Sequence, residues 1–225
     1  MNESPSEAFP SFPKRIIQVF FSPGDLFAAL RDRPAWAGVM TFVAVLVGVS
    51  LVLIPTELWI DFSRARMMEQ GQEIPPGFES SGPMLRIFSV LGGLVVTPIM
   101  MVVLAGIVTF VFSFIFGDDG RFKQYLSVVA HASVISGAGA LLLVPLKIAQ
   151  GDPSLTLSLG TFAVFLGDGY LGRVVERLDL FALWSYAVMA IGVSRIDPRR
   201  SLGFPLAFFM AFALAFALIF GSFGG

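Results

Sequence analysis

The residues best suited to chemistry form one short polar row, Gln124, Ser127 and His131, spaced by three and four positions. In a helix this spacing places the three side chains on one face. His131 is the only histidine of the chain, and an imidazole can gain or lose a proton near neutral pH. Within a membrane, such a row could form a proton or substrate path. The alternative, which we favour, is hydrogen bonding between helices that fixes their register.

A second candidate is Asp179, which directly precedes the apolar run that begins with Leu180. One interpretation is a buried carboxylate paired with Lys147, Arg86 or Arg173, since charges within a membrane are usually paired. The other is a helix N-cap, because an aspartate accepts hydrogen bonds from the first free backbone N–H groups. The two roles are compatible.

Asp118 and Asp119 lie in the short loop Gly117–Gly120. Two adjacent carboxylates without further oxygen ligands fall short of a calcium loop. A turn followed by a helix start explains them more simply. The chain has no cysteine, which excludes thiolate metal ligands and disulfides. We therefore predict no metal site, no cofactor and no catalytic residues.

Composition identifies the elements that must carry these residues. Hydrophobic residues make up 56% of the chain, charged residues only 14%, and the mean hydropathy is +0.81. Soluble domains carry about 25% charged residues. Several uncharged runs reach the roughly 20 residues that a helix needs to cross a bilayer, and they are too long for barrel strands. The sequence thus predicts an all-α integral membrane protein.

We predict a bundle of five transmembrane helices with short interfacial amphipathic helices. The first domain, residues 1–34, is a cytoplasmic N-terminal segment with an interfacial helix, and residues 35–225 form the membrane domain. The expected spans are about 35–55, 92–116, 124–147, 179–196 and 202–221. Gly92-Gly93 or Pro98 is expected to mark either a kink or an interfacial lead-in of the second span. Residues 161–166 are interpreted as a re-entrant or interfacial piece. The fourth span has only fifteen uncharged residues, fewer than a full crossing needs.

Charge predicts the orientation. With the N-terminus inside, nine of the fifteen basic residues lie on the inner side and six on the outer side. Because basic residues are enriched in cytoplasmic loops, this favours a cytoplasmic N-terminus and a C-terminus on the opposite side. The expected partner is the lipid bilayer. The net charge of -1 gives no reason to expect nucleic-acid binding.

The last span carries a row of small residues, Ala207, Ala211 and Ala215, four positions apart. Small residues at this spacing let membrane helices approach closely. We expect the row to pack within the bundle. Self-association of two copies through the same row is the alternative.

Two stretches carry a resemblance to a known family. Gly117–Ser136 and Leu178–Val193 resemble the Yip-one domain family, the Ypt/Rab-interacting proteins, and Ser22-Pro23 with Phe27 resembles its prokaryotic branch. The resemblance implies a five-span topology with the N-terminus inside and a role in organising membranes. The chain lacks the long N-terminal region and the Asp-Leu-Tyr-Gly-Pro signature of eukaryotic members, which argues against binding of small GTPases.

We therefore expect a non-catalytic scaffold or adaptor, placed in a bacterial inner membrane and acting through protein and lipid contacts. The alternative function is a small transporter or channel that uses Gln124, Ser127, His131 and Asp179. A water-filled cavity that reaches His131 would favour transport. A tightly packed bundle around it would favour the scaffold.

Overall fold

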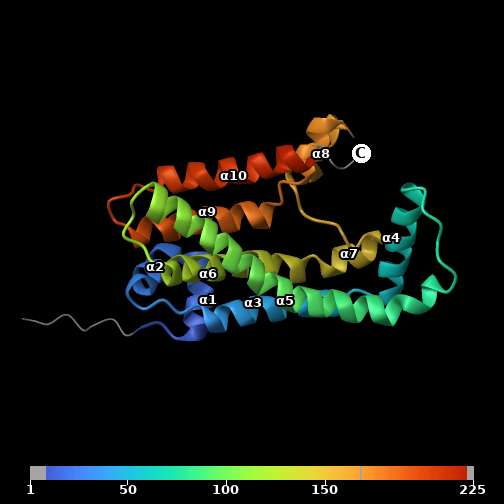
Figure 1. The fold of residues 1–225 in the computed structure, drawn as a ribbon, viewed down its shortest axis with the longest axis horizontal. Helices are drawn as coiled ribbons and strands as arrows, with labels where there is room; N and C mark the ends of the chain where they lie inside the picture. The colour runs from blue at the N-terminus through green and yellow to red at the C-terminus, as the bar shows by residue number, and fades with distance from the viewer. Residues whose placement is uncertain (1–8, 168, 222–225) are drawn as a thin grey trace, which may run out of the picture.

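The computed structural model describes residues 9–167 and 169–221, which fold into a helical bundle with its long helices lying lengthwise beside one another (Figure 1). The α-helices are α1 (Phe12–Phe21), α2 (Pro23–Asp32), α3 (Ala37–Leu53), α4 (Thr56–Glu69), α5 (Gly82–Thr109), α6 (Phe122–Leu142), α7 (Val144–Gln150), α8 (Tyr170–Glu176), α9 (Leu180–Ile196) and α10 (Gly203–Gly221). Short 3₁₀ turns at Phe78–Ser81, Leu159–Phe162 and Val164–Leu166 and a π-helical segment at Phe110–Ile115 complete it.

Helix α6 is the centre of the bundle. It packs against α3 and α5 on one side and against α9 on the other, while α10 covers α9. Twelve of its residues are buried, more than in any other helix of the described part. Helices α1 and α2 close one end by packing against α6 and α9.

In the described residues, three helical stretches are long and apolar enough to cross a membrane: Phe78–Ile115, Phe122–Gln150 and Gly203–Gly221. Helix α3 is joined to α4 across a bend of 83°, and the pair adds a fourth if it is counted as one broken span. Helix α9 is apolar but shorter, with 17 residues. The chain is therefore a multi-pass helical membrane protein.

The second long helix begins earlier than predicted. It runs unbroken through Gly92-Gly93 and Pro98 from Gly82, ten residues before the expected start. Pro83 stands in the first turn, where a missing N–H does no harm. At Gly93, an added Cβ would lie 2.6 Å from Leu51 Cδ1 of α3, so this glycine serves close helix packing rather than a break. The irregular part is the π-helical segment at the other end.

Helix α10 does not pack as predicted. Ala207, Ala211 and Ala215 are exposed, and the helix turns a different face, including Phe209 and Ala213, into the bundle. The helix buries the face that carries Phe209. This ring stacks on Tyr186 of α9, with 6.0 Å between the ring centroids, and it buries more apolar area than an alanine can. The alanine row is thus free of contacts that would bury it within one chain.

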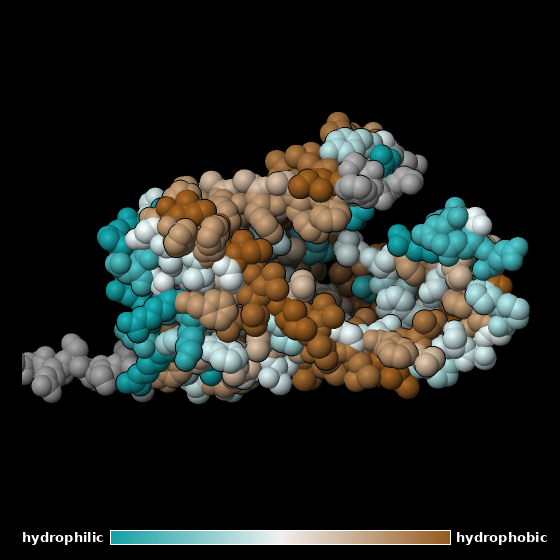
Figure 2. Space-filling view, in the orientation of Figure 1, coloured by the Kyte–Doolittle hydropathy of each residue, from teal (hydrophilic) through white to brown (hydrophobic). Residues whose placement is uncertain are grey.

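The two ends of the bundle are polar and the middle is hydrophobic, as Figure 2 shows for one face. One end holds α1, α2 and the loops α5–α6 and α9–α10; the other holds α4, α7 and α8 (Figure 1). At the latter end, α8 holds the end of α10, because the Tyr170 hydroxyl and Arg173 Nε donate hydrogen bonds to the carbonyls of Leu218 (2.8 Å) and Gly221 (3.1 Å).

Candidate functional site

His131 lies fully buried in α6. Its Nδ1 is 2.8 Å from the Ser127 carbonyl oxygen, and its Nε2 is 3.4 Å from Arg15 Nη1. A carbonyl oxygen can only accept, so Nδ1 carries the hydrogen and Nε2 is left to accept from Arg15. The only histidine is therefore held in one tautomer by one backbone group and one cation.

Arg15 is brought to His131 by α1, which packs directly on α6. Its guanidinium also donates to the Ala35 carbonyl at 3.2 Å and lies 5.5 Å from the ring centroids of Phe9 and Phe12. A charge placed among rings and carbonyls is stabilised by cation–π attraction and hydrogen bonds without a carboxylate partner. This α1 contact closes the bundle over His131.

The predicted polar row is only partly one site. Gln124 lies at the start of α6, where its Oε1 accepts from Arg121 N at 2.6 Å and its Nε2 donates to the Arg31 carbonyl at 2.7 Å. It thereby caps α6 and ties it to α2. The Ser127 hydroxyl is buried and has no partner among residues 9–167 and 169–221. Within the row, Gln124 therefore connects α6 to α2, whereas the Ser127 hydroxyl forms no hydrogen bond with the described residues.

Asp179 lies apart from this row. It is the N-cap of α9, and its Oδ1 accepts from Ala182 N at 2.7 Å. Its backbone forms an isolated bridge with Ser158, in the connection that follows α7 at the other end of the bundle (Figure 1). The structure therefore does not join Asp179 and His131 into one intramembrane site.

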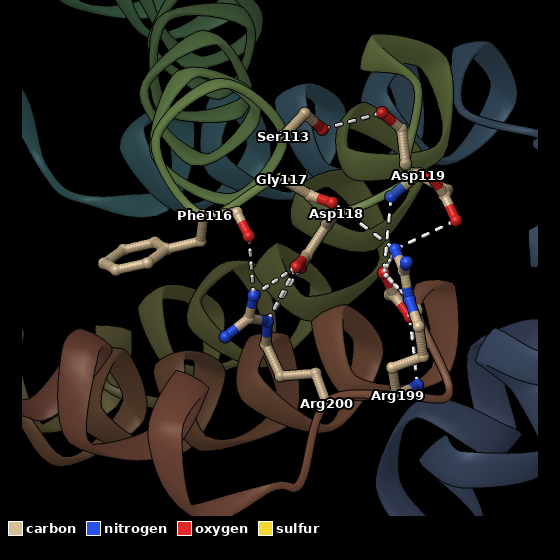
Figure 3. A network of polar contacts seen from close by, with 9 residues as sticks. Ser113, Phe116, Gly117, Asp118, Asp119, Arg199 and Arg200 are labelled. Atoms are coloured by element: carbon tan, nitrogen blue, oxygen red, sulfur yellow. Dashed lines mark hydrogen bonds and ion pairs between the residues drawn. The ribbon is translucent and has the colours of Figure 1, made fainter.

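A charged cluster connects the loops α5–α6 and α9–α10. The sequence did not predict that these residues form one cluster. Asp118, with its side chain only 2% exposed, forms a two-pronged ion pair with Arg200. Figure 3 shows the Arg200 guanidinium between this carboxylate and the Phe116 carbonyl. The guanidinium also lies 5.1 Å from the ring centroid of Phe204. Bidentate pairing in a half-buried setting fixes both loops in one geometry.

Arg199 forms the second half of the cluster. It binds Asp197 through Nε at 3.0 Å and Nη2 at 2.6 Å, and its Nη2 reaches Asp119 at 2.9 Å. Hydrogen bonds from the Arg199 side chain hold the pKa of Asp197 well below its usual range, although burial opposes the shift. We call Asp118, Asp119, Asp197, Arg199 and Arg200 the arginine–aspartate clamp.

One signal in the sequence could have predicted the clamp. The acid pair Asp118-Asp119 and the basic pair Arg199-Arg200 both fall on the predicted inner side, in the two short loops next to spans two and four. Opposite charge pairs in neighbouring loops attract each other where water is partly excluded. The missing information was that α5, α6, α9 and α10 bring those two loops together.

An apolar groove with a volume of about 550 Å³ lies between α3, α5 and α6. Small residues line part of it, among them Gly92, Gly93 and Gly137. Of its serines, Ser89 and Ser133 donate to carbonyls of their own helices. The groove therefore offers an apolar surface with few free donors, and His131 is not among its lining residues.

The matches to known proteins agree with this architecture. The model of the Yip1 domain matches residues 17–223, nearly the whole chain. The chain belongs to the Yip1 domain family. The resemblance seen in the sequence is confirmed. No solved structure matches it.

Among curated proteins, the chain is similar to "Membrane protein YknW" of Bacillus subtilis (strain 168). The two are 24% identical over 177 residues, which cover 79% of this chain and 76% of the relative. This bacterial relative fits a prokaryotic-type member of the Yip1 family. Neither the family description nor the relative's name refers to a reaction.

Proposed function

We propose that this Yip1-family protein is a non-catalytic membrane scaffold or adaptor that holds an apolar helix of a partner protein in the groove between α3, α5 and α6. In this proposal α9 completes a set of five spans. The N-terminus faces the cytoplasm, the C-terminus faces the opposite side, and the membrane is a bacterial inner membrane. Small-GTPase binding and nucleic-acid binding have no place in it.

The observation that carries the proposal is the groove itself. Its volume of about 550 Å³ is large enough for several side chains of a second molecule. Of its glycines, Gly92 is open, since an added Cβ there would meet nothing within 4 Å, and such a position permits close approach of a second helix in lipid. Exposed apolar side chains such as Val96 and Met100 line it on α5. A polar solute would find few partners there, whereas an apolar helix would bury its side chains.

The alternative, a transporter or channel, is less well supported. His131 is fully buried, and Arg15 of α1 occupies the side of its ring that bears Nε2. Asp179, the other residue of that hypothesis, serves as the cap of α9 near the opposite end. A proton or substrate path would need polar groups that follow one another across the bundle.

The experiment is site-specific photocrosslinking in native membranes. A photoreactive residue at Val96, in the groove, should form an adduct with one defined protein; the same residue at Leu214, exposed on α10, is the control. Filling the groove with Gly92→Leu should abolish the Val96 adduct and leave the Leu214 pattern unchanged. Lipid adducts alone at both positions would overturn the proposal.

Solute flux tests the rival function directly. The purified chain in vesicles should show no solute or proton flux above empty vesicles. A flux that disappears in His131→Phe would establish the transporter instead.

A further inference from the structure

A second cavity, polar and separate from the groove, opens at the end that holds α2. Its volume is about 440 Å³. Three arginines line it, each from a different element: Arg31 at the end of α2, Arg195 at the end of α9 and Arg200 in the loop α9–α10. Asp32 is the single acidic residue of its lining. The cavity therefore carries an excess of positive charge.

Two of these arginines have no ion-pair partner in the part of the chain that the structure describes. Arg200 is bound to Asp118 in the arginine–aspartate clamp. Arg31 and Arg195 are exposed and form no ion pair with a carboxylate anywhere in the described ranges 9–167 and 169–221. The Arg195 guanidinium lies against α2, since a Cβ added at Gly24 would be 3.1 Å from its Nη2. It is thus held beside the cavity with its donors open.

The cavity lies where lipid headgroups would be. Leu202, which lines it, is 44% exposed and directly precedes the apolar helix α10. Helix α1, which leads into α2, exposes Ile17 (58%) and Phe21 (84%) one turn apart. Exposed large apolar side chains on a short surface helix mark the boundary between headgroups and acyl chains.

The charge of the whole end agrees with this placement. Segments 9–36, 116–124 and 194–202 contain nine basic and five acidic residues, whereas segments 54–86, 147–167 and 169–179 contain six basic and eight acidic ones. These two sets lie at opposite ends of the bundle (Figure 1). Anionic lipids accumulate against clusters of Lys and Arg, and arginine binds phosphate oxygens through its planar fork.

We propose that Arg31, Arg195 and Arg200 form a binding site for the phosphate of an anionic phospholipid headgroup, with Arg31 and Arg195 as the free donors and Arg200 held in place by the clamp. Phosphatidylglycerol is the probe of this class. This site adds a lipid class to the proposed membrane role. It rests on the proposed function only because it requires the chain to lie in a bilayer. Groove crosslinking and lipid retention are separate measurements, so either proposal can fail alone.

The test is native mass spectrometry of the full chain released from nanodiscs of phosphatidylcholine that contain a minority of phosphatidylglycerol. Wild type should retain phosphatidylglycerol selectively. Each removed arginine should weaken retention about fivefold, and the double variant Arg31→Gln/Arg195→Gln about 25-fold. The variant Arg31→Lys/Arg195→Lys should retain phosphatidylglycerol between wild type and the double glutamine variant, because the charge remains but the planar fork is lost.

The matched control is Arg33→Gln/Lys123→Gln, which removes the same charge from the same end outside the cavity. It should retain phosphatidylglycerol within twofold of wild type. Equal loss in control and cavity variants would mean diffuse electrostatic attraction and would sink the site, as would full retention in both. Displacement of the lipid by soluble glycerol 3-phosphate would identify free phosphate as the ligand and overturn the lipid assignment.

Discussion

The arginine–aspartate clamp and the groove differ in where their side chains find contacts. At the clamped end, the charged side chains of two loops bind one another, with the Asp118 carboxylate 2% exposed. In the groove, helices α3, α5 and α6 leave a space of about 550 Å³ between apolar side chains. The clamp residues have their binding partners within the chain. The groove has surface that a second molecule would bury, which is why we place partner recognition there.

The largest effect on stability is expected for Arg200. Arg200→Gln should lower the free energy of unfolding by about 3–5 kcal/mol, because it leaves the Asp118 carboxylate buried without its cation. Thermal unfolding in detergent measures the loss. Arg33→Gln, which removes an exposed charge at the same end, should change stability by less than about 0.5 kcal/mol. An Arg200→Gln protein as stable as wild type would show that the clamp does not hold the loops.

An intermediate effect on stability is expected from two glycines, one in the packed core and one in the groove. A Cβ at Gly192 of α9 would collide with Val128 Cγ1 of α6, whereas a Cβ at Gly92, in the groove, would meet nothing within 4 Å. Gly192→Ala should therefore destabilise by about 1–3 kcal/mol through overpacking. Gly92→Ala should be neutral or stabilising, because alanine favours a helix by about 1 kcal/mol over glycine. Equal unfolding temperatures for the two variants would contradict the packing described.

The smallest effect at neutral pH concerns Asp197. Because Arg199 lowers the pKa of Asp197 in the folded state, its contribution to stability is complete above the unfolded-state pKa of about 3.9 and is lost as the pH falls through the lower folded value. The stability difference between wild type and Asp197→Asn should thus stay constant from pH 8 to about pH 5 and shrink below about pH 4.

Thermal unfolding across this pH series is the measurement, with Asp61→Asn on the exposed face of α4 as the control. A difference that already shrinks between pH 7 and pH 6 would refute the lowered pKa.

Sequence reasoning predicted the class of fold and most of the helices because uncharged runs such as 202–221 have no other way to satisfy their backbone in lipid. It also placed Asp179 at a helix start, a local property that its neighbours determine. It failed where the answer depends on helices far apart in sequence. The face that α10 buries, the α1 contact at His131 and the pairing of Asp118 with Arg200 are all set by tertiary packing.

The clamp also has a consequence for the order of biogenesis. Asp118 and Arg200 are 82 residues apart, so a ribosome that adds about 5–20 residues per second leaves the carboxylate without its arginine for about 4–16 s. Helices α5 and α6 are therefore complete before the loop between them can be locked. The clamp can close only after α9 and the loop behind it have been synthesised, and its five residues are complete before the last helix, α10, is made.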